Sequence, residues 1–281
     1  MQRSHLTHLD KDSFFLDKGI CIIYTKRKNQ GVTLFGFGGY TKMTAESGKN
    51  QFSTYVIEVR YKEQGRIADN KGRIADAVVG SRDKLLTDWM LTNKANFTSK
   101  QNKFVKAFVS HTNFGFLSFY PNTADFFRTA AKEFVGTAWK ECYPIQLVRV
   151  GVRVQVVTAT SCPFKNLLRA YKGKFAKLTE SDLEKFEGEL VDVGFPMNFE
   201  VGGDGYNIMT GPMKKEQSKG FFPELEEDDL PDVGIYVDVD YFTKNFQKQS
   251  RVSHIYELID KGVAKAREVN DLIISWVSEQ E

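Results

Sequence analysis

Apolar residues along this chain occur in patterns that predict secondary structure. Alternating or continuous runs of β-branched and aromatic residues predict strands. Before the middle of the chain, such runs cover residues 19–25, 32–40, 52–61, 103–110 and 114–120. The last two runs are joined by His111-Thr112-Asn113, which is short enough for a hairpin connection. We therefore expect an antiparallel meander followed by a hairpin.

A polar stretch, residues 62–80, separates the third run from the fourth. It contains the pentapeptide Gly-Arg-Ile-Ala-Asp twice, beginning at Gly65 and at Gly72. Two copies are too few for a solenoid, because stacked repeats need at least about three units for stability. We expect a polar loop over this stretch, followed by a helix over residues 83–91.

Apolar residues spaced three and four apart predict two longer helices. The first has Asn122 or Thr123 as its N-cap and runs to about Trp139. The second covers residues 251–277, which at about 1.5 Å per residue is long enough to cross a sheet. Gly262 within it costs about 1 kcal/mol relative to alanine, so packing rather than helix propensity must stabilise this helix.

The second half of the chain begins with a long amphipathic strand over residues 146–158. Apolar residues alternate there with Arg149, Gly151, Arg153 and Gln155, so that one face is apolar and the other carries arginines. A short helix over residues 181–190 follows, with Ser181 and Glu184 at the spacing of a capping box.

Further strands complete the second half. Residues 191–201 and 206–210 flank Gly202-Gly203-Asp204-Gly205, which predicts the clearest hairpin turn of the chain. Residues 213–231 are polar and rich in carboxylates, and we expect them to form an exposed loop. Residues 233–242 predict the last strand.

The order of these elements indicates an α+β fold, because the βαβα alternation of parallel sheets is missing. We expect antiparallel sheets in two linked halves, residues 1–145 and 146–281, each backed by helices. The long C-terminal helix is expected to pack on the second half.

Composition limits the class of protein. The chain has 281 residues, of which 41% are hydrophobic and 13% aromatic, and this excludes a disordered or collagen-like chain. Its 39 basic and 36 acidic residues give a net charge of +3, which by itself indicates neither nucleic acid nor membrane as a partner. No apolar run approaches the roughly 20 residues that span a bilayer.

The N-terminal residues and the cysteines indicate a compartment. Residues 1–12 lack the apolar segment of a signal peptide. Cys21, Cys142 and Cys162 include no Cys-x-x-Cys pair, which favours reduced thiols over a disulfide framework or a zinc site. We expect a cytoplasmic protein with no cofactor.

Two acids form the one paired-carboxylate geometry that the sequence implies. Asp238 and Asp240 lie two apart on the last predicted strand, so both side chains project from one face together with Tyr236. Carboxylates placed in this way can bind Mg²⁺ for phosphoryl-transfer chemistry. The alternative is a pair of acids on the solvent face of a sheet.

A basic and aromatic segment, residues 164–177, is the candidate for binding nucleic acid or another anion. Its cations could contact phosphates and its aromatic rings could stack on bases. The candidate residues are Lys165, Arg169, Tyr171, Lys172, Lys174 and Lys177. The alternative is an amphipathic helix whose aromatic residues pack inward and whose cations face water.

Other motifs do not identify a reaction. Residues 35–39 are glycine-rich but match neither the P-loop nor the dinucleotide-binding pattern. Residues 114–119 match the last six positions of the RNP1 strand of RNA-recognition motifs, whereas the two preceding positions and the companion strand do not match. His111 and His254 have no nearby nucleophile or acid in the sequence.

The second half of the chain resembles a family of sporadically distributed, uncharacterised bacterial proteins. The resemblance rests on Arg149-Val150-Gly151-Val152-Arg153, on Val237-Asp238-Val239-Asp240 and on the closing helix. Members of that family have a Gly-Leu-Arg strand, an Ile-Asp-x-Asp strand and a closing helix in this order, and this chain departs from them at Val152 and Asn270. The resemblance implies an accessory or defence-related role and carries no assigned reaction.

We therefore expect a non-enzymatic bacterial binding or assembly component, of the kind found in anti-phage defence systems. It is expected to act through a protein partner or by self-association, because long strands leave sheet edges open to a further strand. Two alternatives remain: a nucleic-acid-binding protein that uses residues 164–177, and a metal-dependent phosphoryl-transfer enzyme that uses Asp238 and Asp240.

Overall fold

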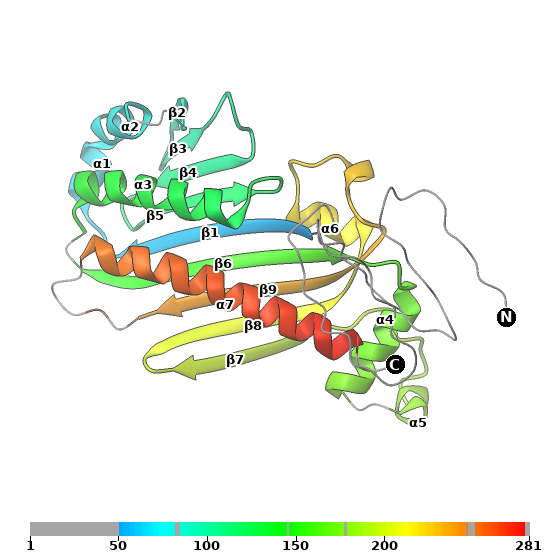
Figure 1. Ribbon diagram of the computed structural model, residues 1–281. Coiled ribbons are helices and arrows are strands. Elements are labelled where there is room, and N and C mark those ends of the chain that lie inside the picture. The colour runs from blue at the N-terminus through cyan, green and yellow to red at the C-terminus, as the bar shows by residue number, and fades with distance from the viewer. Residues whose placement is uncertain are drawn as a thin grey trace, which may run out of the picture.

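One antiparallel sheet contains every strand that the structure describes, in the order β2-β3-β4-β5-β1-β6-β9-β8-β7 (Figure 1). The structure is a computed structural model, and it describes residues 51–81, 85–144, 146–176, 179–244, 246 and 251–278. The strands are β1 Gln51–Tyr61, β2 Asp88–Leu91, β3 Ala95–Thr98, β4 Val105–Val109, β5 Asn113–Phe119, β6 Leu147–Ala159, β7 Phe195–Val201, β8 Asp204–Lys214 and β9 Val233–Thr243. The strands expected over residues 19–25 and 32–40, and Cys21, lie outside the described residues.

The fold is α+β, as the sequence predicts. β1 connects the first part of the chain to the second, because it pairs with β5 on one side and with β6 on the other. Strands from both sides of residue 145 therefore belong to a single continuous sheet. The division into residues 1–145 and 146–281 as separate folding units stays a prediction.

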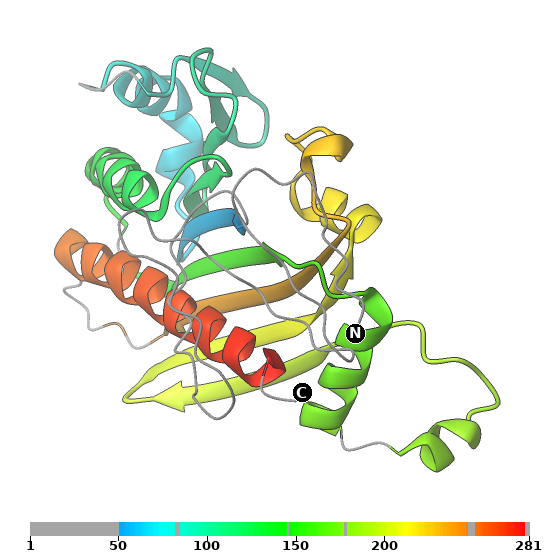
Figure 2. The ribbon, with the colours of Figure 1, turned by 45° about the vertical axis from the view of Figure 1, so that its right-hand side comes forward.

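Two long helices cover one face of this sheet (Figures 1 and 2). α3 (Ala124–Cys142) contacts β5 and β1, α7 (Val252–Ser278) contacts β6 and β9, and the two helices contact each other. Thr123 is the N-cap of α3, as predicted, since its side chain accepts a hydrogen bond from the Phe126 backbone N–H at 3.2 Å. We call the opposite face of the sheet the open face.

The repeated pentapeptide forms helices and not the expected loop. α1 (Gly65–Asp69) and α2 (Lys71–Val79) each contain one copy, and seven residues correspond to two helical turns. Ile67 and Ile74 occupy equivalent positions in the two copies, and both are buried in the main core. The helix expected over residues 83–91 is also wrong, because its last four residues form β2.

The segment expected as an exposed loop, residues 213–231, instead covers one end of the open face. β8 continues to Lys214, and α6 (Lys215–Phe221) and the 3₁₀ turn η2 (Glu227–Asp229) follow. Apolar side chains between and beside these turns pack against β1, β6 and β9 in a second, smaller core. Its buried members are Phe52, Val157, Met213, Phe222, Leu225, Leu230 and Tyr236.

The β7–β8 hairpin is confirmed, with a tight turn at Gly202 and Gly203. Both residues have positive φ angles, 59° and 93°, which glycine adopts without steric cost. α5 (Glu180–Glu184) is shorter than the predicted helix. Its capping box uses Thr179 and Asp182 instead of Ser181 and Glu184, so the predicted cap is wrong by two residues.

Candidate functional site

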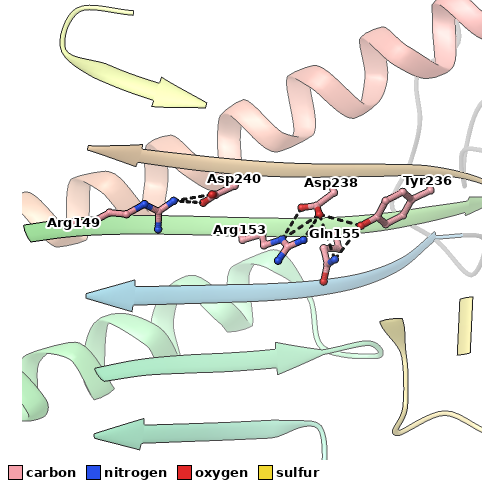
Figure 3. Close-up of polar contacts among 6 residues, drawn as sticks. All are labelled: Arg149, Arg153, Gln155, Tyr236, Asp238 and Asp240. Atoms are coloured by element: carbon pink, nitrogen blue, oxygen red, sulfur yellow. Dashed lines mark hydrogen bonds and ion pairs between the residues drawn. The ribbon is translucent and has the colours of Figure 1, made fainter. Parts of the chain in front are cut away.

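The open face carries a row of polar side chains where β6 lies beside β9 (Figure 3). We call Arg149, Arg153, Gln155, Tyr236, Asp238 and Asp240 the polar row. They share a face because Gln155 lies opposite Asp238 and Arg153 opposite Asp240 in the antiparallel pair, and side chains alternate along each strand. The common face predicted for Asp238 and Asp240 is thus present.

Asp238 accepts hydrogen bonds from three other members of the polar row. Arg153 Nε donates to its Oδ1 and Oδ2 at 2.9 and 3.1 Å, and Arg153 Nη2 donates to Oδ2 at 2.5 Å. Tyr236 Oη and Gln155 Nε2 also donate to Oδ2, at 3.0 and 3.4 Å. The Asp238 side chain is only 8% exposed, whereas that of Arg153 is 51% exposed. The hydrogen bond to Asp238 raises the pKa of Arg153. Burial, together with the Asp238 charge, raises the pKa of Tyr236.

Asp240 is held by the other arginine. Arg149 Nη2 donates to both carboxylate oxygens of Asp240 at 2.7 Å, and the Arg149 Cζ lies 4.7 Å from the ring centroid of Phe242. Gly151 leaves the space along which the Arg149 side chain extends, since a Cβ at position 151 would lie 2.8 Å from the Arg149 Cζ. A glycine between the two arginines therefore allows this ion pair to form.

The contacts within the polar row indicate that its charged side chains stabilise the sheet. Carboxylate oxygens are the groups that Mg²⁺ would require, and here they already accept hydrogen bonds from guanidinium groups. Across the described parts of the chain, no group of three or more His, Cys, Asp or Glu side chains is placed to hold a metal ion. Two arginines and two aspartates also cancel in charge. The arrangement joins β6 to β9 through cross-strand pairs on the open face of the sheet.

The basic segment, residues 164–177, folds as α4 (Phe164–Tyr171) and a π-helical turn, η1 (Lys172–Ala176). Lys177 lies outside the described residues. Lys165 and Arg169 are exposed on α4, and Lys165 Nζ lies 3.4 Å from Glu189 Oε1.

The remaining candidates of the basic segment are less accessible. Lys172 is 9% exposed, and Lys174 Nζ lies 5.6 Å from the ring centroid of Trp276. Tyr171 is fully buried, and its hydroxyl lies within hydrogen-bond distance, 2.8 Å, of Thr210 Oγ1. Its ring stacks on Phe175, with 5.4 Å between the ring centroids. Tyr171 is therefore unavailable for stacking on a base. The aromatic residues pack inward, as in the alternative of an amphipathic helix, but Lys172 is buried with them and does not face water.

Neither described cysteine has the environment of a nucleophile. Cys142 and Cys162 are both buried. Burial raises the pKa of the Cys142 thiol to about 12, so the thiol stays protonated and unreactive near neutral pH.

The two edges of the sheet differ in a way that bears on association. At one end β2 pairs only with β3 among the described strands, and its last three side chains are exposed: Trp89 by 45%, Met90 by 62% and Leu91 by 40%. Met90 points to the open face, because residues directly opposite each other share a face and a continuous line of such pairs crosses the sheet from Met90 to Gly151, which lies between Arg149 and Arg153. The line runs through Asn96, Phe108, Gly115 and Glu58. Trp89 and Leu91 therefore point to the face that carries the helices. No proline or lysine interrupts this strand.

β7, at the other end of the sheet, has features that obstruct further pairing. Val201 and Asp204 close the two-residue turn as a hydrogen-bonded pair, so alternate residues from Val201 direct their backbone groups to β8. Pro196, Asn198 and Glu200 then direct theirs outward. Pro196 has no N–H to donate, and Glu200 adds an exposed charge, two devices that protect natural edge strands.

The exposed residues of β2 were not identified by the sequence reasoning, which expected a helix over residues 83–91. The available signal was the sequence Trp-Met-Leu at positions 89–91, three large apolar residues in a polar region. Those residues become a candidate contact surface only once β2 is placed at the sheet edge.

Comparison with family models, with curated proteins and with solved structures gives no match to this chain. Among the described helices, none is long and apolar enough to cross a membrane.

Proposed function

We propose that this chain is a non-enzymatic binding or assembly component that associates with another protein chain through the exposed edge of β2. The observation that carries the proposal is the run of three exposed apolar side chains, Trp89 to Leu91, on an edge strand without a protecting proline or lysine. An edge strand offers unpaired backbone N–H and C=O groups, and its natural ligand is a further extended strand.

The side chains of β2 favour a protein partner over a small molecule. Tryptophan and methionine are enriched at protein–protein interfaces and contribute large apolar areas. The backbone groups of the edge add a row of hydrogen bonds, which contribute affinity. The side chains determine the register of the bound strand. The charges of the polar row cancel, and Lys165, one of the two exposed cations on α4, lies 3.4 Å from the Glu189 carboxylate, so we place the principal contact at β2.

The broader context of the proposal rests on the sequence. The resemblance of the second half to sporadically distributed bacterial proteins supports a bacterial chain with an accessory role such as anti-phage defence. The Cys142 thiol, which is free and buried, supports a reducing compartment such as the cytoplasm.

A capture experiment with three forms of the full chain tests this function. The tagged wild type, the Met90→Lys variant and the Met209→Lys variant are each incubated with an extract of the native host, and retained proteins are quantified by mass spectrometry. Met209 is a matched control, because it is also an exposed methionine on the open face, 41% exposed, but lies on β8 inside the sheet.

The proposal predicts that the wild type and Met209→Lys retain the same protein, and that Met90→Lys loses it. Retention of untagged copies of this chain and retention of a different chain both agree with the proposal. Equal retention by all three forms, or retention by none together with a strictly monomeric chain, would overturn the proposal.

A further inference from the structure

We infer that the strand bound at the β2 edge belongs to a second copy of this chain, with two β2 strands paired antiparallel about a two-fold axis at Met90. This inference rests on the proposed function, since it names the partner of the same edge. Its basis is that the order of side chains along β2 is self-complementary when the strand is reversed.

The register follows from the rule that residues directly opposite each other in an antiparallel pair point to the same face. With the axis at Met90, each Met90 lies opposite the Met90 of the second copy on the open face. Trp89 then lies opposite Leu91 of the second copy on the face that carries the helices, and the reverse pair forms by symmetry. Every exposed apolar side chain of β2 thereby meets an apolar side chain.

Neighbouring registers lack this match. If the axis lay at Trp89, Asp88 would face Met90 of the second copy, and a charged group would be placed against an apolar one. If the axis lay at Leu91, Met90 would face Thr92 and Trp89 would face Asn93, so two large apolar side chains would face polar ones. The two-fold axis at Met90 is therefore the register that buries the most apolar surface.

Charges at the two ends of β2 favour the same arrangement. Lys71 Nζ donates to the backbone carbonyl of Thr92 at 3.0 Å, which places a cation at the C-terminal end of the strand. Asp88 lies at the other end, with a side chain that is 36% exposed and pairs with Lys100 Nζ of its own chain at 2.9 Å. In the Met90-centred register, Asp88 lies opposite Thr92 of the second copy and so approaches the Lys71 there. At both ends of the paired strands, Asp88 is then placed between Lys100 of its own chain and Lys71 of the second copy.

The short length of β2 limits the affinity that we expect between the two copies. A contact between two four-residue strands and their side chains is smaller than the roughly 1,200 Å² of total area at the low end of stable, specific interfaces. The dimer should therefore depend on concentration, with a Kd on the order of micromolar to tens of micromolar.

Sedimentation of the purified full chain tests the inference. We expect the weight-average mass of the wild type to rise from one chain towards two between about 1 and 100 μM, a range that brackets the expected Kd. Met90→Lys should stay at the mass of one chain over the same range, because it places two like charges across the axis. Met209→Lys should behave as the wild type does.

A cysteine at the axis gives a second, independent readout. In a Cys21→Ser background, Met90→Cys should form a covalent dimer in oxidised glutathione. Directly opposite Cβ atoms in an antiparallel pair lie about 4.5 to 5.5 Å apart, and a small shift brings them to the roughly 3.5 to 4.5 Å of a disulfide. Met209→Cys should stay a monomer under the same conditions, and the native Cys142 and Cys162 are buried.

The outcomes separate this inference from the proposed function. A wild type that stays monomeric, with no preferential cross-linking at position 90, overturns the self-pairing. If in that case Met90→Lys still abolishes capture of a different protein, the proposed function stands and only the identity of the partner is wrong. If no association depends on position 90, both are wrong.

Discussion

Gly262 of α7 lies directly against Val152 of β6, so that a Cβ at position 262 would come within 2.6 Å of the Val152 Cβ. The helix thus approaches the sheet as closely as a backbone without a side chain allows. The sequence predicts that packing must compensate for this glycine, and the contact with Val152 is that packing.

Gly262→Ala should destabilise the protein even though alanine has the higher helix propensity. The substitution gains about 1 kcal/mol of propensity, and overpacking against a buried valine costs about 1 to 3 kcal/mol, so we expect a net loss of about 1 kcal/mol. Urea denaturation measures it.

Two controls accompany the Gly262→Ala measurement. Adding Val152→Ala should make the change at position 262 neutral or stabilising, because it removes the clashing methyl groups. Ala264→Gly, at an exposed position of the same helix, should cost about 1 kcal/mol. A stabilising Gly262→Ala in the wild-type background would contradict the close approach.

Asp238→Asn should destabilise the sheet more than a change at an exposed acid. It removes the charge that Arg153, Tyr236 and Gln155 all face, and hydrogen bonds to charged groups contribute about 1.5 to 3 kcal/mol. Because the Arg153 side chain is half exposed, solvent screening reduces the contribution of these hydrogen bonds. We expect the free energy of unfolding to fall by about 1 to 2 kcal/mol. Asp232→Asn, at a side chain that is 87% exposed, should cost less than about 0.5 kcal/mol.

The same denaturation experiments, repeated with Mg²⁺, distinguish structural ion pairs from a metal site. A metal that binds the folded state raises its stability in proportion to the logarithm of metal concentration above the Kd. We expect no such increase, since guanidinium groups occupy the carboxylates of Asp238 and Asp240. A Mg²⁺-dependent increase that Asp240→Asn abolishes would restore the phosphoryl-transfer alternative.

The Cys142 thiol should make stability fall at alkaline pH. Its pKa is about 12 in the folded state because of burial, against about 8.5 for a free thiol in the unfolded chain. Above about pH 8.5 the unfolded chain loses this proton while the folded protein keeps it, so the contribution to stability is complete below that pH and declines as pH rises. The stability difference between the wild type and Cys142→Ala should be larger at pH 7.5 than at pH 9.5. An equal stability difference at pH 7.5 and at pH 9.5 would show that folding does not change the pKa of this thiol.

The basic segment should not produce strongly salt-dependent binding to nucleic acid. Its exposed described cations on α4 are Lys165 and Arg169. Two phosphate contacts would weaken binding only about tenfold between about 50 and 200 mM salt. A gel-shift titration with single- and double-stranded nucleic acid checks this. A loss of a hundredfold or more that Lys165→Glu with Arg169→Glu removes would favour the nucleic-acid alternative.

Elements with a regular period along the chain could be predicted from the sequence. β6 and β9 alternate because one face packs under α7 and the other carries the polar row, and this alternation also places Asp238 and Asp240 together. α3 and α7 follow the helical period because each packs one side on the sheet. In all four cases, a local pattern reflects a single packed face.

The contacts between distant segments could not be predicted in the same way. Arg153 and Asp238 are 85 residues apart, and their pairing depends on the register between two strands. β2 is four residues long and becomes a strand only by pairing with β3, so a short apolar run was compatible with a helix as well. The sequence predicts an exposed loop over residues 213–231, and this prediction is wrong. The few apolar residues of the segment pack on a surface formed by β1, β6 and β9, which are distant in the sequence.

Amide hydrogen exchange of the full chain, measured at low and at high protein concentration, tests the central claim most directly. If the β2 edge pairs with another copy, peptides covering Asp88–Leu91 should exchange more slowly at high concentration, and Met90→Lys should abolish the difference. Peptides covering Phe195–Val201, at the protected edge, should exchange at the same rate at both concentrations. Exchange of the β2 peptides that does not change with concentration or with Met90→Lys, or protection that appears at β7 instead, would contradict the account.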